Sequence, residues 1–126
     1  MIYGIGHDIV ENERIKRLLM LYGERFITKI LTTQEISIYN HKTASISYLA
    51  KRFAAKEAFA KACGTGLRYP VTLSNISILN DTQGKPIITF APELADWLKQ
   101  KNIHTAHLSI SDEKHYSSAF VVLEGT

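Results

Sequence analysis

Residues 45–63 read SISYLAKRFAAKEAFAKAC, and this stretch decides the fold. It contains six alanines and no glycine or proline, a composition that favours a helix. Gly64 follows directly and is typical of the residue that ends a helix. Because alanine side chains let neighbouring backbones come close, we expect a long central helix around which the rest of the chain packs.

The remaining elements follow outward from this helix. Upstream, the pattern predicts a strand over residues 2–9, helices over residues 11–21 and 26–31, and a helix from Thr32 to about His41 that begins with a capping box. Downstream, it predicts a hairpin of residues 75–79 and 86–90, a helix from Pro92 to about Lys101, and a second hairpin of residues 104–111 and 115–124. Strands that pair by hairpins predict an α+β fold with a small, mostly antiparallel sheet.

The bulk properties indicate one domain over residues 1–126. No apolar run reaches the length of a membrane span, and the first ten residues lack the basic leader of a signal peptide. Cys63 is the only cysteine, so no internal disulfide forms, and we expect a cytoplasmic location. The net charge of +3 favours an acidic partner or a phosphate-rich ligand.

The first predicted strand carries a candidate ligand, Asp8. Alternation along a strand places Asp8 on the same face as Gly4 and Gly6, and His7 on the other. Glycine within a strand often marks the close approach of a ligand or another backbone. Asp8 therefore lies either on an open floor that receives a metal or phosphate, or beside a closely packed helix, where it caps the next element.

The central helix carries a second carboxylate, Glu57, on an otherwise mostly apolar face. Lys61, four residues on, offers a simple ion pair as one explanation. Gly64, Thr65 and Gly66 follow and offer backbone N–H groups and a hydroxyl to phosphate oxygens. Because the dipole at a helix C-terminus disfavours anions, neighbouring lysines and arginines would have to supply the positive charge.

Four ordered motifs across the chain resemble those of the bacterial holo-[acyl-carrier-protein] synthase family. They are residues 4–11 with Arg14 and Ile15, residues 51–58 with residues 61–62 and 64–66, residues 84–86, and residues 107–113. The resemblance implies the 4'-phosphopantetheinyl transferase fold. It also implies an enzyme that transfers phosphopantetheine from coenzyme A to a serine of acyl carrier protein, in support of fatty acid biosynthesis. His7 departs from the family pattern, and we interpret it as a packing or interface residue.

The same resemblance assigns roles to individual residues. It implies that Asp8 and Glu57 hold Mg²⁺ at the pyrophosphate of coenzyme A, which agrees with the preference of Mg²⁺ for one or two carboxylates with phosphate oxygens. Lys61 is expected to contact the phosphates, beside Gly64, Thr65 and Gly66. Three further cations are candidates for the nucleotide: Arg52, Lys56 and Lys85.

The resemblance also implies a general base, a docking helix and an assembly. His107 lies on the polar face of its predicted strand, and its ordinary pKa suits a base near neutrality; Glu57 and a metal-bound water are the alternatives. Arg14 and Arg17 are expected to bind the acidic carrier protein, unless Arg14 pairs internally with Glu11 or Glu13. The family forms homotrimers with active sites between subunits.

Two other function classes stay open at this stage. A non-catalytic module that binds coenzyme A or a nucleotide would use the same lysines without needing Asp8 and Glu57 together. A nucleic-acid-binding domain would use the basic residues between positions 14 and 25, but aromatic residues are not interleaved with them as stacking platforms usually are. We therefore expect neither a nucleic acid nor a membrane as partner.

Overall fold

The computed structural model describes residues 1–39 and 46–126. Its elements are β1 (Ile2–Glu11), α1 (Asn12–Tyr22), α2 (Glu24–Ile30), α3 (Thr33–Tyr39), α4 (Ile46–Cys63), a 3₁₀ turn η1 (Leu73–Asn75), β2 (Ile76–Asn80), β3 (Pro86–Phe90), α5 (Pro92–Gln100), β4 (Ile103–Asp112) and β5 (Tyr116–Gly125). The order and type of the predicted elements are confirmed. The predicted helix end near His41 and the predicted helix start at Ser45 lie outside the described residues.

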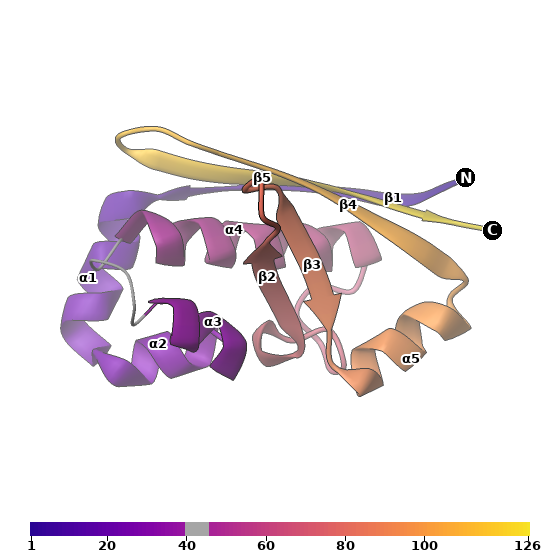
Figure 1. Cartoon of the computed structure of the whole chain (residues 1–126), viewed down its shortest axis with the longest axis horizontal. Helices are drawn as coiled ribbons and strands as arrows, with labels where there is room; N and C mark the ends of the chain where they lie inside the picture. The colour runs from indigo at the N-terminus through magenta and orange to yellow at the C-terminus, as the bar shows by residue number, and fades with distance from the viewer. Residues whose placement is uncertain (40–45) are drawn as a thin grey trace.

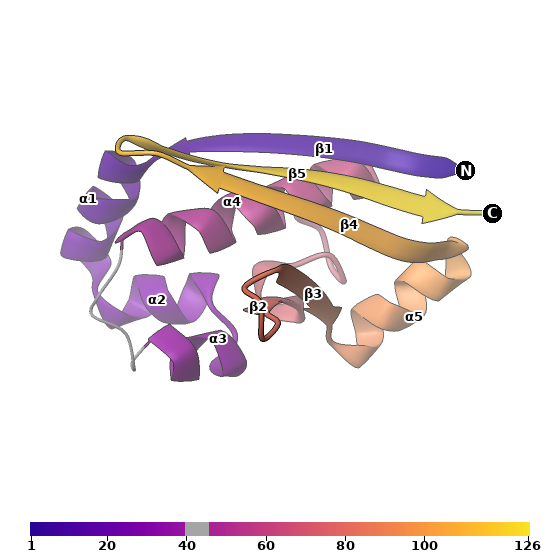
Figure 2. The same cartoon turned by 45° about the horizontal axis from the view of Figure 1, so that its top comes forward.

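The strands form two antiparallel sheets, one of order β1-β5-β4 and one of β2 and β3. Figure 2 shows the three long strands side by side, with both termini at the same end of the molecule. The two predicted hairpins, β2–β3 and β4–β5, are confirmed. The pairing of the first strand with the last is an addition that local pattern does not predict; it places Asp8 opposite Ala119.

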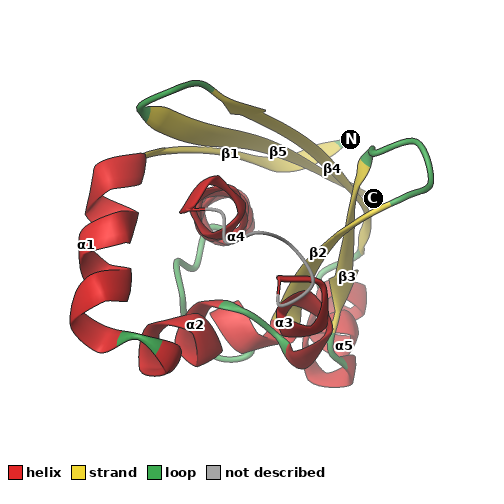
Figure 3. Cartoon of the chain, turned by 60° about the vertical axis from the view of Figure 1, so that its left-hand side comes forward, coloured by secondary structure: helices red, strands yellow, loops and turns green. Residues whose placement is uncertain are grey.

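Helix α4 is the central helix that the alanine-rich stretch predicts. It lies along one face of the three-stranded sheet (Figure 1), and the other elements surround it: α1 on one side, the β2–β3 hairpin on the other, and α2 and α3 beneath (Figure 3). Its six alanines are all buried, which small side chains allow on a helix that is covered on several sides. None of the helices in the described ranges combines the length and apolar character needed to cross a membrane.

The glycines of β1 explain how closely α4 packs on the sheet. A Cβ at Gly4 would overlap the carbonyl oxygen of Ala62, and a Cβ at Gly6 would overlap that of Ala58. The backbones of β1 and α4 are therefore in direct contact. Of the two interpretations of these glycines, the packed helix is correct and the open floor is wrong, because α4 fills the space beside them.

Candidate active site

Asp8 faces α4 and pairs with a lysine of that helix. The Nζ atom of Lys61 donates to Asp8 Oδ1 at 3.1 Å and to the carbonyl oxygen of His7 at 3.0 Å. The side chain of Asp8 is 17% exposed, and that of Lys61 is 54% exposed. Asp8 does not cap α1, because Glu11 occupies the N-cap position and makes no side-chain capping bond. The capping interpretation of Asp8 is therefore wrong.

Glu57 lies on α4 one turn before Lys61 and is half-buried. Burial raises the pKa of the Glu57 carboxyl, and the nearby charge of Asp8 raises it further, while Lys61 and Arg14 act in the opposite direction. Two carboxylates and two cations thus lie within electrostatic reach of one another at the boundary of β1, α1 and α4. In the described residues, the ion pair of Lys61 is with Asp8 and not with Glu57.

The two carboxylates fit a divalent cation. Asp8 raises the pKa of Glu57 because two neighbouring anions repel, and a cation between them would relieve this repulsion. Their oxygens are hard donors, and Mg²⁺ commonly binds one or two carboxylates and completes its shell with water and phosphate oxygens. The described residues hold no cluster of three or more metal-binding side chains, so the remaining ligands would come from solvent and substrate.

Two of the backbone N–H groups that the loop after α4 could offer to phosphate already have acceptors within the protein. The Gly64 N–H donates to the carbonyl of Lys61, and the Gly66 N–H donates to that of Ala60. Both glycines have positive φ, of 80° and 66°, which favours glycine there. The Thr65 hydroxyl donates to the Gly66 carbonyl. The loop therefore ends the helix and turns the chain beside Lys61, while two of its N–H groups are already bonded.

A cavity of about 510 Å³ opens in front of Glu57. Its walls come from α1, α2, α4 and the segment that follows α4, and they are largely apolar. Two cations, Arg25 and Lys29, also line it. The other lining residues are Leu18, Tyr22, Phe26, Ile30, Phe53, Glu57, Leu67 and Leu73. The cavity leaves no local signal in the sequence, because its walls converge only when four separate segments pack.

Lys56 occupies a different place from the one predicted. Its side chain is fully buried, and its Nζ donates to Glu35 Oε1 at 2.5 Å, to the Ile30 carbonyl at 2.7 Å and to the Leu73 carbonyl at 3.1 Å. Burial lowers the pKa of Lys56, and the Glu35 carboxylate opposes this shift. The three bonds use all three ammonium donors. The prediction that Lys56 contacts the nucleotide is therefore wrong, because its donors are used inside the protein.

Arg52 and Lys85 lie on the side of the molecule formed by the β2–β3 hairpin. The Arg52 guanidinium stacks 3.8 Å over the Tyr48 ring and donates to Asn80 Oδ1 at 2.9 Å. Its buried Nε has no hydrogen-bond partner among the described residues. Arg52 lines a hollow of about 450 Å³ that includes Pro86. Lys85 lines a neighbouring hollow of about 400 Å³ that shares Pro86 and contains His107.

His107 is not next to Asp8 within one chain. It pairs with Val122 in the sheet, whereas Asp8 pairs with Ala119, so the alternation of side chains places the two on opposite faces. The His107 Nε2 lies 2.5 Å from Glu124 Oε1, and this hydrogen bond lowers the pKa of Glu124. The predicted site residues thus separate into a carboxylate group around Glu57 and a group around Lys85 and His107.

The remaining predicted residues lie on α1. Arg17 faces Glu11 at 3.9 Å, and both side chains are at least half exposed. Arg14 forms no ion pair within the described part of the chain. The internal pairing of Arg14 with Glu11 or Glu13 is therefore not present, which leaves its guanidinium available beside Glu57.

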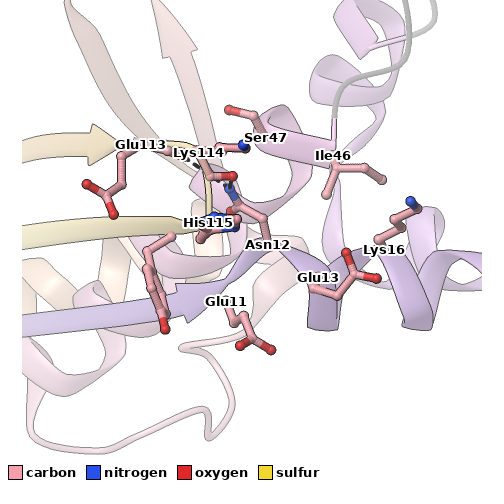
Figure 4. A pocket seen from close by; sticks show the side chains of 10 residues that line it. Glu11, Asn12, Glu13, Lys16, Ile46, Ser47, Glu113, Lys114 and His115 are labelled. Atoms are coloured by element: carbon pink, nitrogen blue, oxygen red, sulfur yellow. Dashed lines mark hydrogen bonds between the residues drawn. The ribbon is translucent and has the colours of Figure 1, made fainter.

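A further hollow, of about 540 Å³, lies where β1 meets α1 and the β4–β5 turn (Figure 4). Its labelled side chains include Glu11, Glu13, Lys16 and His115, together with Ser47 at the start of α4. None of the residues predicted to act in catalysis, metal binding or nucleotide binding lines this hollow.

Comparison with known proteins gives consistent matches over the whole chain. The model of the 4'-phosphopantetheinyl transferase superfamily matches residues 4–121. The holo-[acyl-carrier-protein] synthase of Nitrosomonas eutropha is 56% identical over 124 residues, which is 98% of this chain and 99% of that protein. The holo-[acyl-carrier-protein] synthase of Neisseria meningitidis, solved as a crystal structure, has a TM-score of 0.96 at 49% identity and covers 98% of this chain and 99% of its own.

A second solved structure carries a ligand. The holo-(acyl-carrier-protein) synthase of Bacillus anthracis, in complex with CoA (3',5'-ADP), has a TM-score of 0.84 at 40% identity and covers 100% of this chain and 99% of its own. These matches confirm the resemblance that the four motifs carry. The chain therefore belongs to the 4'-phosphopantetheinyl transferase superfamily.

Proposed function

We propose that this protein transfers the 4'-phosphopantetheine group of coenzyme A to a serine of apo acyl carrier protein and releases adenosine 3',5'-bisphosphate. The observation that carries the proposal is the meeting of Asp8, Glu57 and Lys61 at the contact of β1 with α4. Membership of the superfamily, with a relative named holo-[acyl-carrier-protein] synthase at 56% identity, supports the same reaction. A non-catalytic binding module would not need the two carboxylates together.

The reaction exchanges one P–O bond for another. The serine oxygen of the carrier bonds to the β-phosphorus of coenzyme A, the bond from that phosphorus to the bridging oxygen breaks, and the serine proton is removed. Asp8 and Glu57 would hold Mg²⁺, which supplies charge neutralisation at the pyrophosphate. Lys61, which pairs with Asp8 in the free protein, would offer its ammonium group to the same phosphate oxygens. Glu57 and a water on the metal are the candidates to accept the serine proton at this place.

The nucleotide half of coenzyme A fits the second group of residues. The hollows beside Arg52 and beside Lys85 and His107 adjoin at Pro86, and both offer cations to phosphate. The buried Nε of Arg52, which has no partner within residues 1–39 and 46–126, is a donor that a bound ligand would satisfy. His107 can serve as a base only if a neighbouring subunit brings it to the carboxylates, because the sheet separates them within one chain.

A homotrimer with shared active sites would join the two groups. The outer face of the three-stranded sheet, which carries His107, also exposes several apolar side chains: Tyr3, Ile5, Ile9, Tyr116 and Phe120. Apolar side chains gathered on one sheet face are typical of an interface between proteins. The proposed site requires subunits that meet so that the hollows of one chain lie against the carboxylates of its neighbour, and this face is the candidate for that contact. His7 lies on the same face beside Phe120.

The carrier protein would dock on α1. Arg14 and Arg17 offer guanidinium groups to an acidic partner, and the cavity in front of Glu57 places Arg25 and Lys29 nearby. A carrier held there would present its serine next to the carboxylates.

A cytoplasmic location is part of the proposal. Burial raises the pKa of the single thiol, Cys63, to about 12, so this cysteine has no redox role in it.

The direct test is to mix the purified protein with coenzyme A, Mg²⁺ and apo acyl carrier protein, and to weigh the carrier by intact mass spectrometry. We expect a mass increase of one phosphopantetheinyl group, which a chelator abolishes. Asp8→Asn and Glu57→Gln should each slow transfer by at least about a hundredfold. Glu93→Gln, an exposed carboxylate on α5, is the matched control and should transfer normally. Binding of coenzyme A without any mass change would favour the non-catalytic module instead.

A further inference from the structure

A buried polar cluster borders the cavity that Glu57 lines, because two of its hydrogen-bond acceptors belong to residues that line this cavity. Lys56 and Glu35 form its centre, and both side chains are 0% exposed. The Glu35 carboxylate also accepts from the Thr32 N–H at 2.9 Å and from the Ile78 N–H at 2.8 Å. Isolated charges are costly to bury, so this pair is stable only with its full set of hydrogen bonds.

The bonds of Lys56 connect the helix of Glu57 to the walls of the cavity. The two carbonyls that accept from its Nζ belong to Ile30, the last residue of α2, and Leu73, in η1. Both residues line the cavity, as does Glu57, the residue that follows Lys56 on α4. One ammonium group therefore fixes two walls of the cavity to the helix that supplies its carboxylate.

We propose that Lys56 is a positioning residue that holds Ile30 and Leu73 at a set distance from Glu57, and so shapes the place where the carrier serine meets the carboxylate. The inference rests on the proposed transfer activity and deepens it. Lys56 itself touches neither substrate, because all of its donors are used inside the protein. The alternative is that Lys56 and Glu35 only balance each other's charge in the core. In that case a neutral pair of side chains at these two positions would leave kcat unchanged, provided that the protein stays folded.

Four variants separate these two explanations. Lys56→Met removes the three bonds and leaves the Glu35 carboxylate buried alone, which strongly destabilises proteins. The double variant Lys56→Met/Glu35→Gln removes that lone charge, so it should be more stable than Lys56→Met, yet it still releases both carbonyls. Glu35→Gln takes the counter-ion from the buried Lys56 ammonium and should therefore also cost stability, but it leaves an amide oxygen for Lys56 and the two wall carbonyls of Ile30 and Leu73 as acceptors. Phe59→Leu is the matched control, since Phe59 is fully buried on α4 but packs against Phe90 of β3.

The measurements are the thermal midpoint, kcat and KM for coenzyme A and for the carrier, all at a temperature where every variant is folded. If Lys56 positions the walls, the double variant should lose kcat by about tenfold to a hundredfold, because a displacement of about 1 Å near the reacting atoms has effects of this size. Its KM for coenzyme A should stay at the parent value. Glu35→Gln and Phe59→Leu should lose stability but keep kcat.

A second readout is independent of transfer. Hydrogen–deuterium exchange of the amides around Ile30 and Leu73 should be faster in the double variant than in Glu35→Gln or Phe59→Leu. Parent-level kcat and unchanged exchange in the double variant would overturn the inference, as would an equal loss of kcat in Phe59→Leu. If the parent protein transfers nothing while exchange responds as described, the proposed function fails and the wall-holding role of Lys56 stands.

Discussion

The contact of Gly6 with α4 gives the sharpest test of how this site is assembled. A Cβ at Gly6 would lie 2.7 Å from the Ala62 nitrogen, against 3.4 Å for an ordinary van der Waals contact, and closer still to the Ala58 carbonyl oxygen. Both atoms are helix backbone and cannot rotate away. In Gly6→Ala, α4 must therefore move from β1 by at least 0.7 Å.

This displacement separates the groups that the proposed reaction uses. Asp8 lies on β1, and Glu57 and Lys61 lie on α4, so any shift between the two elements widens the site directly. We expect transfer to slow by one to two orders of magnitude, since a misplacement of about 1 Å can cost about a hundredfold. Overpacking of a close contact should also lower the free energy of unfolding by about 1–3 kcal/mol.

The assay is the rate of carrier mass increase, measured beside a urea unfolding curve. Gly125→Ala is the matched control: its Cβ would lie 3.0 Å from the Asn102 carbonyl carbon, so it also meets backbone, but between the ends of β4 and β5. This control should lose stability and keep its transfer rate. A folded Gly6→Ala protein with parent turnover would refute the view that the β1–α4 contact sets the site.

Three further predictions concern single residues. His107→Ala should raise KM for coenzyme A more than it lowers kcat, measured by steady-state kinetics; a changed acid limb at saturating coenzyme A would instead identify His107 as the base. Arg14→Ala should lower kcat/KM for the carrier and flatten its salt dependence, with KM for coenzyme A unchanged, whereas Arg17→Ala should have less effect because Arg17 already faces Glu11. Burial and Asp8 raise the pKa of Glu57, and we expect only its carboxylate form to be active, so kcat should increase with pH through a value above that of a free glutamate. Higher Mg²⁺ should move this acid limb of the pH–rate profile to lower pH, because proton and metal compete for the carboxylate; a limb that does not move would exclude Glu57 as a metal ligand.

Local signals in the sequence predicted the elements well. The capping box forms as expected, with the Thr32 N–H bonded to Glu35 and the Glu35 N–H bonded to the Thr32 hydroxyl, because both partners lie within one turn. The β2–β3 turn also follows its local chemistry, with Asp81 Oδ1 accepting from the backbone of Gln83 and Lys85. Such bonds depend on neighbours in the chain, and the sequence displays those neighbours directly.

Contacts between distant segments could not be predicted in the same way. Lys56 has the pattern of a surface cation next to Glu57, and only the convergence of α2, α3 and η1 supplies the three acceptors that let it be buried. The polar strand face of His107 was predicted correctly, but which side of the sheet that face takes depends on the pairing of β5 with β1. The hydrophobic periodicity of the sequence therefore predicts neither the burial of Lys56 nor the side of the sheet on which His107 lies.

The pairing of Asp8 with Lys61 connects this packing to the proposed chemistry. Lys61 is half exposed, and an ion pair that solvent reaches contributes only about 0–1 kcal/mol, so it is inexpensive to rearrange. We therefore expect Lys61 to neutralise Asp8 in the free protein and to turn to phosphate oxygens when substrate binds. Among the described residues Glu57 forms no ion pair, and burial raises the pKa of its carboxyl. We therefore expect the two acids to differ in role, because the ion pair of Lys61 is with Asp8.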